Sequence, residues 1–261
     1  MMVAGEPGVD CPTADNQRPV LVLTRPTARV GSTLKAMNEI GVVCLHLPVI
    51  ELVPLDRLDP IDPATVDLIV FVSPAAVEHG LATLRMLVTD KPVVAVGAAT
   101  ASALAKQGVK AEAPEYGMRS EDLLSINTVS NLRASSQVLI VKGEGGRAFL
   151  ADALTAQGHR VVTVDVYRRQ HQSVDTTGLD AALDASLPIS ILITSEDALN
   201  ALHRCVSAPS WKLLTERARP IVYSERLAFM AGNYGFATPG ARVTPGDLVE
   251  LARVVRPTST I

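Results

Sequence analysis

Short runs of apolar, mostly β-branched residues alternate along the chain with segments in which apolar residues recur at helical spacing. From Val20 onward these runs are predicted as strands, each short and nearly all apolar, as expected of strands that are covered on both faces. The predicted strands are residues 20–23, 42–53, 68–72, 93–96, 138–141, 161–167, 189–193 and 221–223. Strands that alternate with helices in this way predict an α/β fold built on parallel sheets.

The strand–helix units recur in the same order in the second half of the chain. Matching glycines or serines are separated by 117 residues (41 to 158), 122 residues (73 to 195) and 127 residues (108 to 235). Such near-constant offsets predict a duplication, hence two α/β lobes with a ligand-binding cleft between them. The alternative interpretation is that any two strand–helix units look alike.

Composition narrows the class of protein. The 261 residues are 48% hydrophobic and 20% charged, which is typical of a globular chain. A net charge of −3 and an aromatic content of 3% argue against nucleic acid or an anionic membrane as partner. Residues 1–17 lack periodicity and any secretory signal and are expected to be a disordered tail. Three widely separated cysteines are interpreted as reduced thiols, so a cytoplasmic location is expected.

Motifs for metal, nucleophilic and phosphoryl-transfer chemistry are missing from the sequence. The five histidines form no HxH or HExxH pair, and the cysteines have no CxxC spacing. No GxSxG turn and no P-loop lysine is present. We therefore expect no metal and no cofactor.

The segment Gly143–Ala148 nevertheless resembles a dinucleotide-binding turn. It follows a predicted strand, opens a helix, and is followed by Asp165, 20 residues after Gly145. Against a nucleotide, Glu144 would lie beside the pyrophosphate, and the matching turn of the first repeat contains no glycine. A nucleotide-binding enzyme and a tight turn that binds another anion both remain open.

Polar residues follow most of the predicted strands, at the edge where open parallel sheets bind ligands. Hydroxyls, helix N-termini and a few arginines gathered there would suit carboxylates, although each Ser or Thr could equally be a helix N-cap. These positions are Thr24, Arg25, Ser73, Gly97 to Thr100, Lys142 to Arg147, Ser195, and Ser224 to Arg226. Tyr167 also ends a predicted strand and could be either functional or a half-buried strand aromatic. The two arginines that follow it are interpreted as a solvated edge.

Eight segments, in order, resemble the uroporphyrinogen-III synthase family: LTRP, FVSPAAV, VAVGAATASAL, RSEDLL, VKGEGGRAFLADAL, VDVYRR, LITSEDAL and VYSERLA. The resemblance covers about Pro19 to Val254. It implies two doubly wound parallel-sheet lobes joined by a two-stranded linker, with the chain crossing near residues 47–53 and 164–170. The first lobe would comprise residues 18–49 plus 171–261, and the second residues 50–170.

The resemblance implies an activity as well. The expected substrate is hydroxymethylbilane, which the upstream deaminase would hand over and which a monomeric, cofactor-independent enzyme would cyclise with loss of water and inversion of the last ring. Tyr167 matches the family's tyrosine expected to help the hydroxyl leave, and Thr100 matches the threonine of its VGxxTA segment. The other expected substrate contacts are Thr24, Arg25, Ser73, Gly97, Gly143, Arg147, Ser195, Ser224 and Arg226, of which the last and Arg147 would pair with carboxylates.

One departure from the family pattern is that Glu196 and Asp197 follow Ser195, where members often carry Pro and a small residue. Two negative charges near a polyanion put the contact by Ser195 in question. The rival from another functional class is a non-catalytic two-lobed ligand-binding or regulatory protein on the same scaffold.

Overall fold

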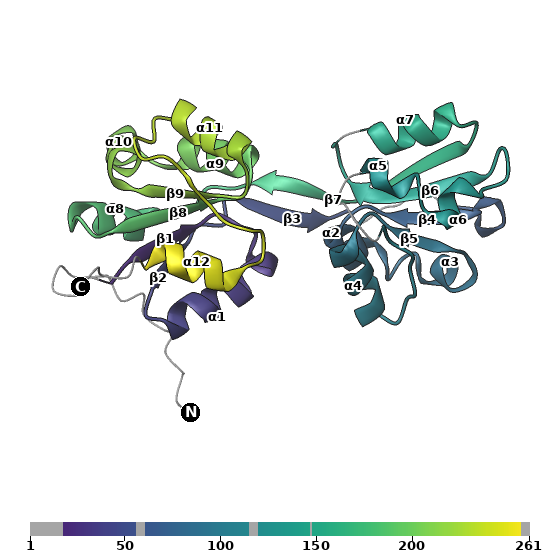
Figure 1. The fold of residues 1–261 in the computed structure, drawn as a ribbon, viewed down its shortest axis with the longest axis horizontal. Coiled ribbons are helices and arrows are strands. Elements are labelled where there is room, and N and C mark those ends of the chain that lie inside the picture. Colours follow the sequence, from purple (N-terminus) through teal and green to yellow (C-terminus); the bar gives the residue numbers. More distant parts are fainter. Residues whose placement is uncertain (1–17, 56–60, 115–119, 147, 257–261) are drawn as a thin grey trace. The chain divides into compact units, whose positions relative to one another are not determined.

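The computed structural model describes residues 18–55, 61–114, 120–146 and 148–256 (Figure 1). The chain divides into two compact units, which we call unit 1 (Met1–Glu51 with His171–Ile261) and unit 2 (Leu52–Gln170). Each unit contains one five-stranded sheet with helices on both faces, which confirms the expected α/β class. The expected tail at residues 1–17 and the candidate Arg147 lie outside the described residues.

Unit 1 contains a sheet of strand order β10-β9-β8-β1-β2, in which every neighbouring pair is parallel. The strands are β1 (Val20–Leu23), β2 (Val43–His46), β8 (Ile189–Ile193), β9 (Arg219–Val222) and β10 (Ala241–Arg242). One face of the sheet is covered by α1 (Gly31–Glu39) and α12 (Leu248–Val255). A short 3-10 helix, η1 (Thr27–Arg29), precedes α1 in the chain. On the other face lie α8 (Thr177–Asp184), α9 (Glu196–Cys205), α10 (Ala208–Arg217) and α11 (Glu225–Asn233).

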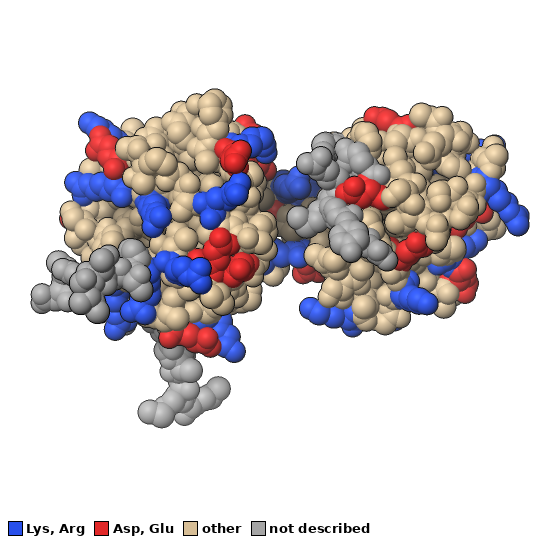
Figure 2. All heavy atoms as spheres, in the orientation of Figure 1, with Lys and Arg blue, Asp and Glu red and all other residues tan. Residues whose placement is uncertain are grey.

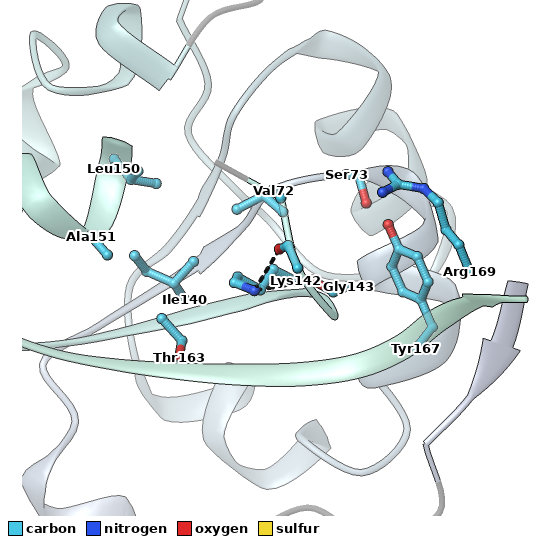
Figure 3. Close-up of a pocket in the computed structure, with 12 residues that line it drawn as sticks. Val72, Ser73, Ile140, Lys142, Gly143, Leu150, Ala151, Thr163, Tyr167 and Arg169 are labelled. Carbon is cyan, nitrogen blue, oxygen red and sulfur yellow. Dashed lines mark hydrogen bonds between the residues drawn. The ribbon is translucent and has the colours of Figure 1, made fainter. Parts of the chain in front are cut away.

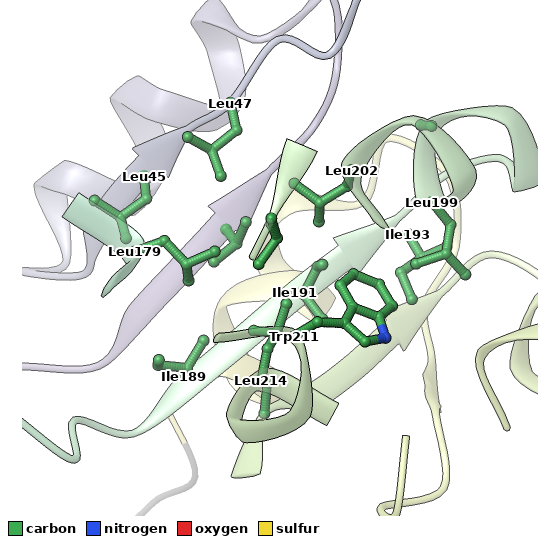
Figure 4. Close-up of a cluster of buried hydrophobic side chains, with 14 of the residues drawn as sticks. Leu45, Leu47, Leu179, Ile189, Ile191, Ile193, Leu199, Leu202, Trp211 and Leu214 are labelled. Atoms are coloured by element: carbon green, nitrogen blue, oxygen red, sulfur yellow. The ribbon is translucent and has the colours of Figure 1, made fainter. Parts of the chain in front are cut away.

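Apolar side chains from both faces of this sheet form the core of unit 1. All four residues of β1 are fully buried, which explains why the strand carries no polar residue. Figure 4 shows the cluster between the sheet and α8–α10, where Trp211 packs among leucines and isoleucines and its indole N–H donates to the Tyr234 carbonyl at 3.2 Å. Burial of an aromatic with its polar atom satisfied stabilises this face of the sheet.

Unit 2 contains a sheet of strand order β3-β7-β6-β4-β5. The strands are β3 (Ile50–Pro54), β4 (Leu68–Phe71), β5 (Val93–Ala95), β6 (Gln137–Gly143) and β7 (Arg160–His171). One face carries α2 (Pro74–Gly80), α3 (Arg85–Asp90) and α4 (Ala98–Lys106), and the other carries α5 (Ser120–Leu123), α6 (Asn127–Ser130) and α7 (Phe149–Ala156). A short 3-10 helix, η2 (Pro63–Thr65), precedes β4.

The two strands β3 and β7 cross the boundary between the units. Their hydrogen bonds, from Leu55 to Val166 and from Gln172 to Val49, run in opposite order along the two strands, so this pair is antiparallel. The prediction of one continuous strand over 42–53 is wrong. Pro48 has no N–H to donate, and the Val49 N–H closes a tight turn onto the Leu47 carbonyl at 2.8 Å. The chain therefore leaves the unit-1 sheet after β2 and enters a separate strand.

The strand registers confirm the duplication residue by residue. The pair Val20–Val43 in unit 1 matches Gln137–Arg160 in unit 2, and both positions are shifted by 117. The other two offsets recur in the same way: Leu21–Ser190 matches Val138–Leu68 (117 and 122), and Ile191–Pro220 matches Ile69–Val93 (122 and 127). The unit-1 sheet thus combines two strands from the first half of the chain with three from the second, and the unit-2 sheet combines three with two, so the repeats and the units have different boundaries.

Candidate active site

A pocket of about 220 Å³ lies at the carboxyl edge of the unit-2 sheet (Figure 3). Its floor is apolar and its rim carries hydroxyl and cationic groups. The lining residues are Val72, Ser73, Ile140, Lys142, Gly143, Gly145, Gly146, Leu150, Ala151, Thr163, Tyr167 and Arg169. Three of the expected site residues, Ser73, Gly143 and Tyr167, are therefore brought together here. An apolar pocket with a few polar groups at this edge of a parallel sheet is the usual setting for a small ligand.

A β-bulge sets the direction of Tyr167. Lys142 pairs with Asp165 and the next residue, Gly143, pairs with Tyr167, so β7 has one more residue than β6 at this point. The Tyr167 side chain then crosses Gly143 so closely that a Cβ there would lie 2.4 Å from its Cζ. The Glu144 N–H donates to the Tyr167 carbonyl at 2.7 Å, and the phenol ring lies 5.5 Å from the ring of His79. With only 6% of its surface exposed, Tyr167 is more buried than expected for a half-buried strand aromatic.

The hydroxyl of Tyr167 points toward Ser73 and toward the guanidinium of Arg169 (Figure 3). Among the described residues no group forms a hydrogen bond with this hydroxyl, and none forms an ion pair with Arg169. Both arginines after Tyr167 are exposed, as expected of a solvated edge, and Arg169 also lines the pocket. Side chains alternate between the two faces of a strand, so the sequence alone places residues 167 and 169 on the same side.

Ser73 also caps the helix that follows it. Its Oγ accepts a hydrogen bond from the Ala76 N–H at 3.1 Å, at the N-terminus of α2. The hydroxyl proton is not used in this contact, so Ser73 can still donate to a ligand in the pocket. The N-cap interpretation is therefore correct for this residue without excluding the functional one.

The glycine turn after β6 is built around Lys142 rather than around an anion. The Lys142 ammonium donates to the carbonyls of Gly143 and Gly145 at 3.1 and 2.9 Å and to Asp165 at 2.8 Å. A dinucleotide turn needs N–H groups facing the pyrophosphate and a free acidic residue for the ribose. Here two carbonyls face inward and Asp165 is already paired, so the nucleotide interpretation is wrong.

Two other unit-2 candidates lie outside this pocket. Gly97 precedes α4 as its N-cap residue, and Thr100 is 4% exposed in the first turn of that helix. The Thr100 N–H donates to the Gly97 carbonyl at 3.0 Å, so the two positions are locked together. The structure gives Thr100 a buried side chain and no contact with the Tyr167 pocket.

The unit-1 candidates occupy the equivalent edge of the other sheet. Thr24 is buried at the end of β1, and Arg25 lines a smaller pocket of about 60 Å³ that also includes Thr33, Tyr223 and Asp247. Ser195 and Ser224 cap α9 and α11, as Ser73 caps α2. In all three helices the serine Oγ accepts a hydrogen bond from the N–H three residues later, which is why a serine is favoured at each of these positions.

The charges that follow Ser195 are both paired within unit 1. Glu196 accepts from Arg226 at 3.3 Å, and Asp197 bonds to the His171 ring at 2.8 Å. Arg204 approaches the other ring nitrogen of His171 at 3.3 Å. The negative charge is thereby offset locally, but Arg226 is engaged by a protein carboxylate rather than free for one on a ligand.

Other chemistry finds no additional support in the described ranges. No group of three or more His, Cys, Asp or Glu side chains that could hold a metal occurs among them. Cys44 and Cys205 are free thiols, and burial raises the pKa of Cys44 to about 11. A thiol with so high a pKa is a poor nucleophile at neutral pH.

The visible surface of each unit mixes both signs of charge, with Lys and Arg interspersed among Asp and Glu (Figure 2). This mixture agrees with the small net charge of −3. Within the described part of the chain, no helix has the length and hydropathy needed to cross a bilayer.

Comparison with known proteins agrees with these features. The family model described as uroporphyrinogen-III synthase HemD matches residues 32–248. The chain is 28% identical over 230 residues to uroporphyrinogen-III synthase of Escherichia coli K12, covering 83% of this chain and 92% of the relative. The Salmonella typhimurium protein of the same name is 29% identical over the same shares of the two chains.

Solved structures show the same fold. Uroporphyrinogen-III synthetase from Helicobacter pylori has a TM-score of 0.60 at 17% identity, covering 92% of this chain and all of that one. A mutant uroporphyrinogen III synthase from Thermus thermophilus has a TM-score of 0.54 at 16% identity, covering 91% and 98% of the two chains. Since the family model spans most of the sequence, the chain belongs to the uroporphyrinogen-III synthase family.

Proposed function

We propose that this chain closes hydroxymethylbilane into uroporphyrinogen III, with loss of water and inversion of the last pyrrole ring. The observation that carries the proposal is the unit-2 pocket, where the Tyr167 hydroxyl has no hydrogen-bond partner among the described residues. A phenol O–H can donate its proton to a departing hydroxyl group. Family membership supplies the substrate class.

In the proposed reaction Tyr167 donates its proton to the terminal hydroxyl of the bilane as the carbon–oxygen bond breaks. Water leaves, and the positive charge spreads over the adjoining pyrroles, whose nitrogens stabilise it without help from the protein. The cationic carbon then bonds to the already substituted carbon of the last ring, which gives a spiro intermediate. The bond that joined this ring carbon to the bridge from the neighbouring ring breaks, and the bridge carbon re-bonds to the free carbon of the last ring, so the ring is inverted. The proton lost from that free carbon restores the phenol. The protein thus needs one donor and firm positioning of a flexible chain.

Positioning is the larger task, because unassisted closure without inversion competes. The apolar floor formed by Val72, Ile140 and Leu150 can hold a pyrrole face, while Ser73 and Arg169 at the rim can bind its acetate or propionate. We assign Ser73, Gly143, Tyr167 and Arg169 to the reacting end of the substrate. Among the other candidates, Thr24, Arg25, Gly97, Thr100, Arg147, Ser195 and Ser224 remain proposed contacts for the rest of it, and Arg226 would join them only by leaving Glu196.

The deciding experiment supplies the purified chain with hydroxymethylbilane made in place by a purified deaminase. After oxidation, chromatography separates isomers I and III of the resulting uroporphyrin. We expect isomer III to predominate without any added cofactor and in the presence of EDTA. Product no richer in isomer III than a protein-free control would support the non-catalytic binding scaffold instead, and a loss of activity in EDTA would contradict the cofactor-free reaction.

We further propose that the chain works as a cytoplasmic monomer that receives the bilane directly from the deaminase. The near-neutral surface and the free thiols of Cys44 and Cys205 support this setting. Sedimentation of the pure protein tests the monomer, since a concentration-dependent increase in mass would contradict it. Sedimentation of a mixture with the deaminase tests the hand-over, since unchanged boundaries at high concentration would contradict a direct complex.

A further inference from the structure

Lys142 lines the pocket beside Tyr167, yet its charged end is fully engaged inside unit 2. The ammonium group has three N–H donors, and three acceptors match them: the Gly143 and Gly145 carbonyls and Asp165. No donor is left over for a carboxylate of a ligand. Lys142 therefore acts on the protein around the pocket rather than on what the pocket binds.

The contacts of Lys142 lie at the register shift between β6 and β7, where the hydrogen bonds between the two strands no longer hold the backbone in place. Lys142 and Asp165 are opposite one another immediately before the register shift, and Gly143 and Tyr167 are opposite one another immediately after it. A bulge interrupts the ladder of hydrogen bonds, so residues beyond it need other contacts to hold them in place. The Lys142–Asp165 ion pair, 2.8 Å long and only partly exposed, fastens β6 to β7 there.

The turn that Lys142 holds has little conformational preference of its own. Gly145 and Gly146 both adopt positive φ values of 72° and 87°, in the region that glycine enters and leaves freely. Binding of the Gly143 and Gly145 carbonyls by one ammonium restricts this freedom. Gly143 is the residue on which the Tyr167 ring rests, so any shift of the turn changes the surface beneath the phenol.

We infer that Lys142 is a positioning residue that, with Asp165, fixes the Tyr167 phenol over Gly143. The effect of Lys142 on catalysis rests on the proposed function, whereas its effect on the position of the Tyr167 ring can be observed in the protein alone. Two readouts therefore separate the inference from the function. One observes the ring directly and the other measures turnover.

The ring is observed by ¹⁹F NMR of protein labelled with 3-fluorotyrosine, which has four tyrosine signals. Tyr167→Phe identifies the signal of Tyr167. Lys142→Met removes the ammonium and keeps an unbranched side chain, and we expect it to shift or broaden that signal while the other three stay in place. Lys142→Arg should leave a signal close to that of the unmodified protein. Lys212→Met, which removes an exposed lysine of unit 1, is the matched control. An unmoved Tyr167 signal in Lys142→Met overturns the inference.

Turnover is compared in a double-mutant cycle. We expect Lys142→Met to lower kcat about tenfold with KM changed less than about twofold, and to have less than about a twofold effect in the Tyr167→Phe background. An equal loss in both backgrounds overturns the inference, because Lys142 would then act independently of the phenol. Should Lys142→Met fail to fold, Asp165→Asn keeps an acceptor and should give the same pattern with a smaller loss. If the unmodified chain makes no isomer III, the proposed function fails while the ¹⁹F signal still decides the position of the ring.

Discussion

The turn after β1 in unit 1 and the turn after β6 in unit 2 are equivalent by register, yet they differ in what they can bind. In unit 1 the His46 ring bonds to the Arg25 carbonyl at 2.8 Å, and Glu51 accepts from the N–H of Thr27 at 2.9 Å. These contacts hold the turn against β2 and β3, and the pocket that Arg25 lines with Tyr223 and Asp247 is about 60 Å³. In unit 2 the glycine turn is bound to Lys142 through the Gly145 carbonyl, and a pocket of about 220 Å³ lies beside it.

The partner strands of these turns explain the difference. β2 has four residues and ends before Pro48, whereas β7 has twelve and continues past the edge of its sheet. Only a strand that continues can carry Tyr167 and Arg169 over the end of β6. One scaffold thus supports a closed edge or an open site, depending on whether the second strand stops or runs on.

The largest effect should come from the glycine beneath the phenol. Gly143→Ala places a methyl group where the Tyr167 ring lies, so the ring must leave. We expect kcat to fall about 100-fold and the free energy of unfolding to fall by about 1–3 kcal/mol. Gly31→Ala, at the start of α1, has nothing within 4 Å of the added methyl and should change neither quantity much. Activity in Gly143→Ala near that of the unmodified chain would show that the ring need not rest there.

A smaller effect separates two serines that have the same structural role. Ser73→Ala and Ser195→Ala each remove one N-cap hydrogen bond, so each should lower the free energy of unfolding by about 1 kcal/mol. Only Ser73 lines the Tyr167 pocket, so we expect kcat/KM to fall about tenfold for Ser73→Ala and less than about twofold for Ser195→Ala. Equal losses of activity would mean that the edge of unit 1 binds the reacting end as closely as unit 2 does.

The smallest effect is expected from thiol alkylation, because residues 52–170 contain no cysteine. Iodoacetamide at pH 8 should leave turnover within about twofold of its starting value. Burial raises the pKa of Cys44 to about 11, so its reactive thiolate is scarce at pH 8 and increases only as the pH approaches that value. Peptide mass spectrometry should find Cys44 unmodified at pH 8. Inactivation in step with alkylation would place a thiol at the site and contradict the assignment to unit 2.

Much of the fold could be predicted from the sequence because strands covered on both faces must be apolar. β1 and β8 were expected at the residues where they occur, and the repeat offsets correspond to the registers of both sheets. The break at Pro48 was missed because an apolar run looks the same whether it stays in one sheet or changes sheets. The two-residue β10 lacks a run long enough to be recognised.

The candidate site was only partly predictable, for reasons of geometry. Ser73, Ser195 and Ser224 share one local pattern, because capping a helix needs the same side chain whether or not a ligand lies nearby. The bulge that turns Tyr167 into the pocket depends on pairing between strands and leaves no mark in either strand alone. The role of Lys142 depends on that bulge and is visible only in the structure, whereas the place of Arg169 follows from that of Tyr167 by the period of two along the strand.

We propose the Tyr167 hydroxyl as the proton donor of the unit-2 pocket. Tyr167→Phe keeps the ring on Gly143 and removes only the donor, and Tyr234→Phe removes a hydroxyl from the aromatic cluster of unit 1 as the matched control. The most direct test is the initial rate of isomer III formation by the two variants at saturating bilane. We expect a loss of about tenfold to 100-fold for Tyr167→Phe, an unchanged melting temperature, and full activity for Tyr234→Phe. Full activity in Tyr167→Phe, or a loss that occurs only because the protein unfolds, would contradict this proposal.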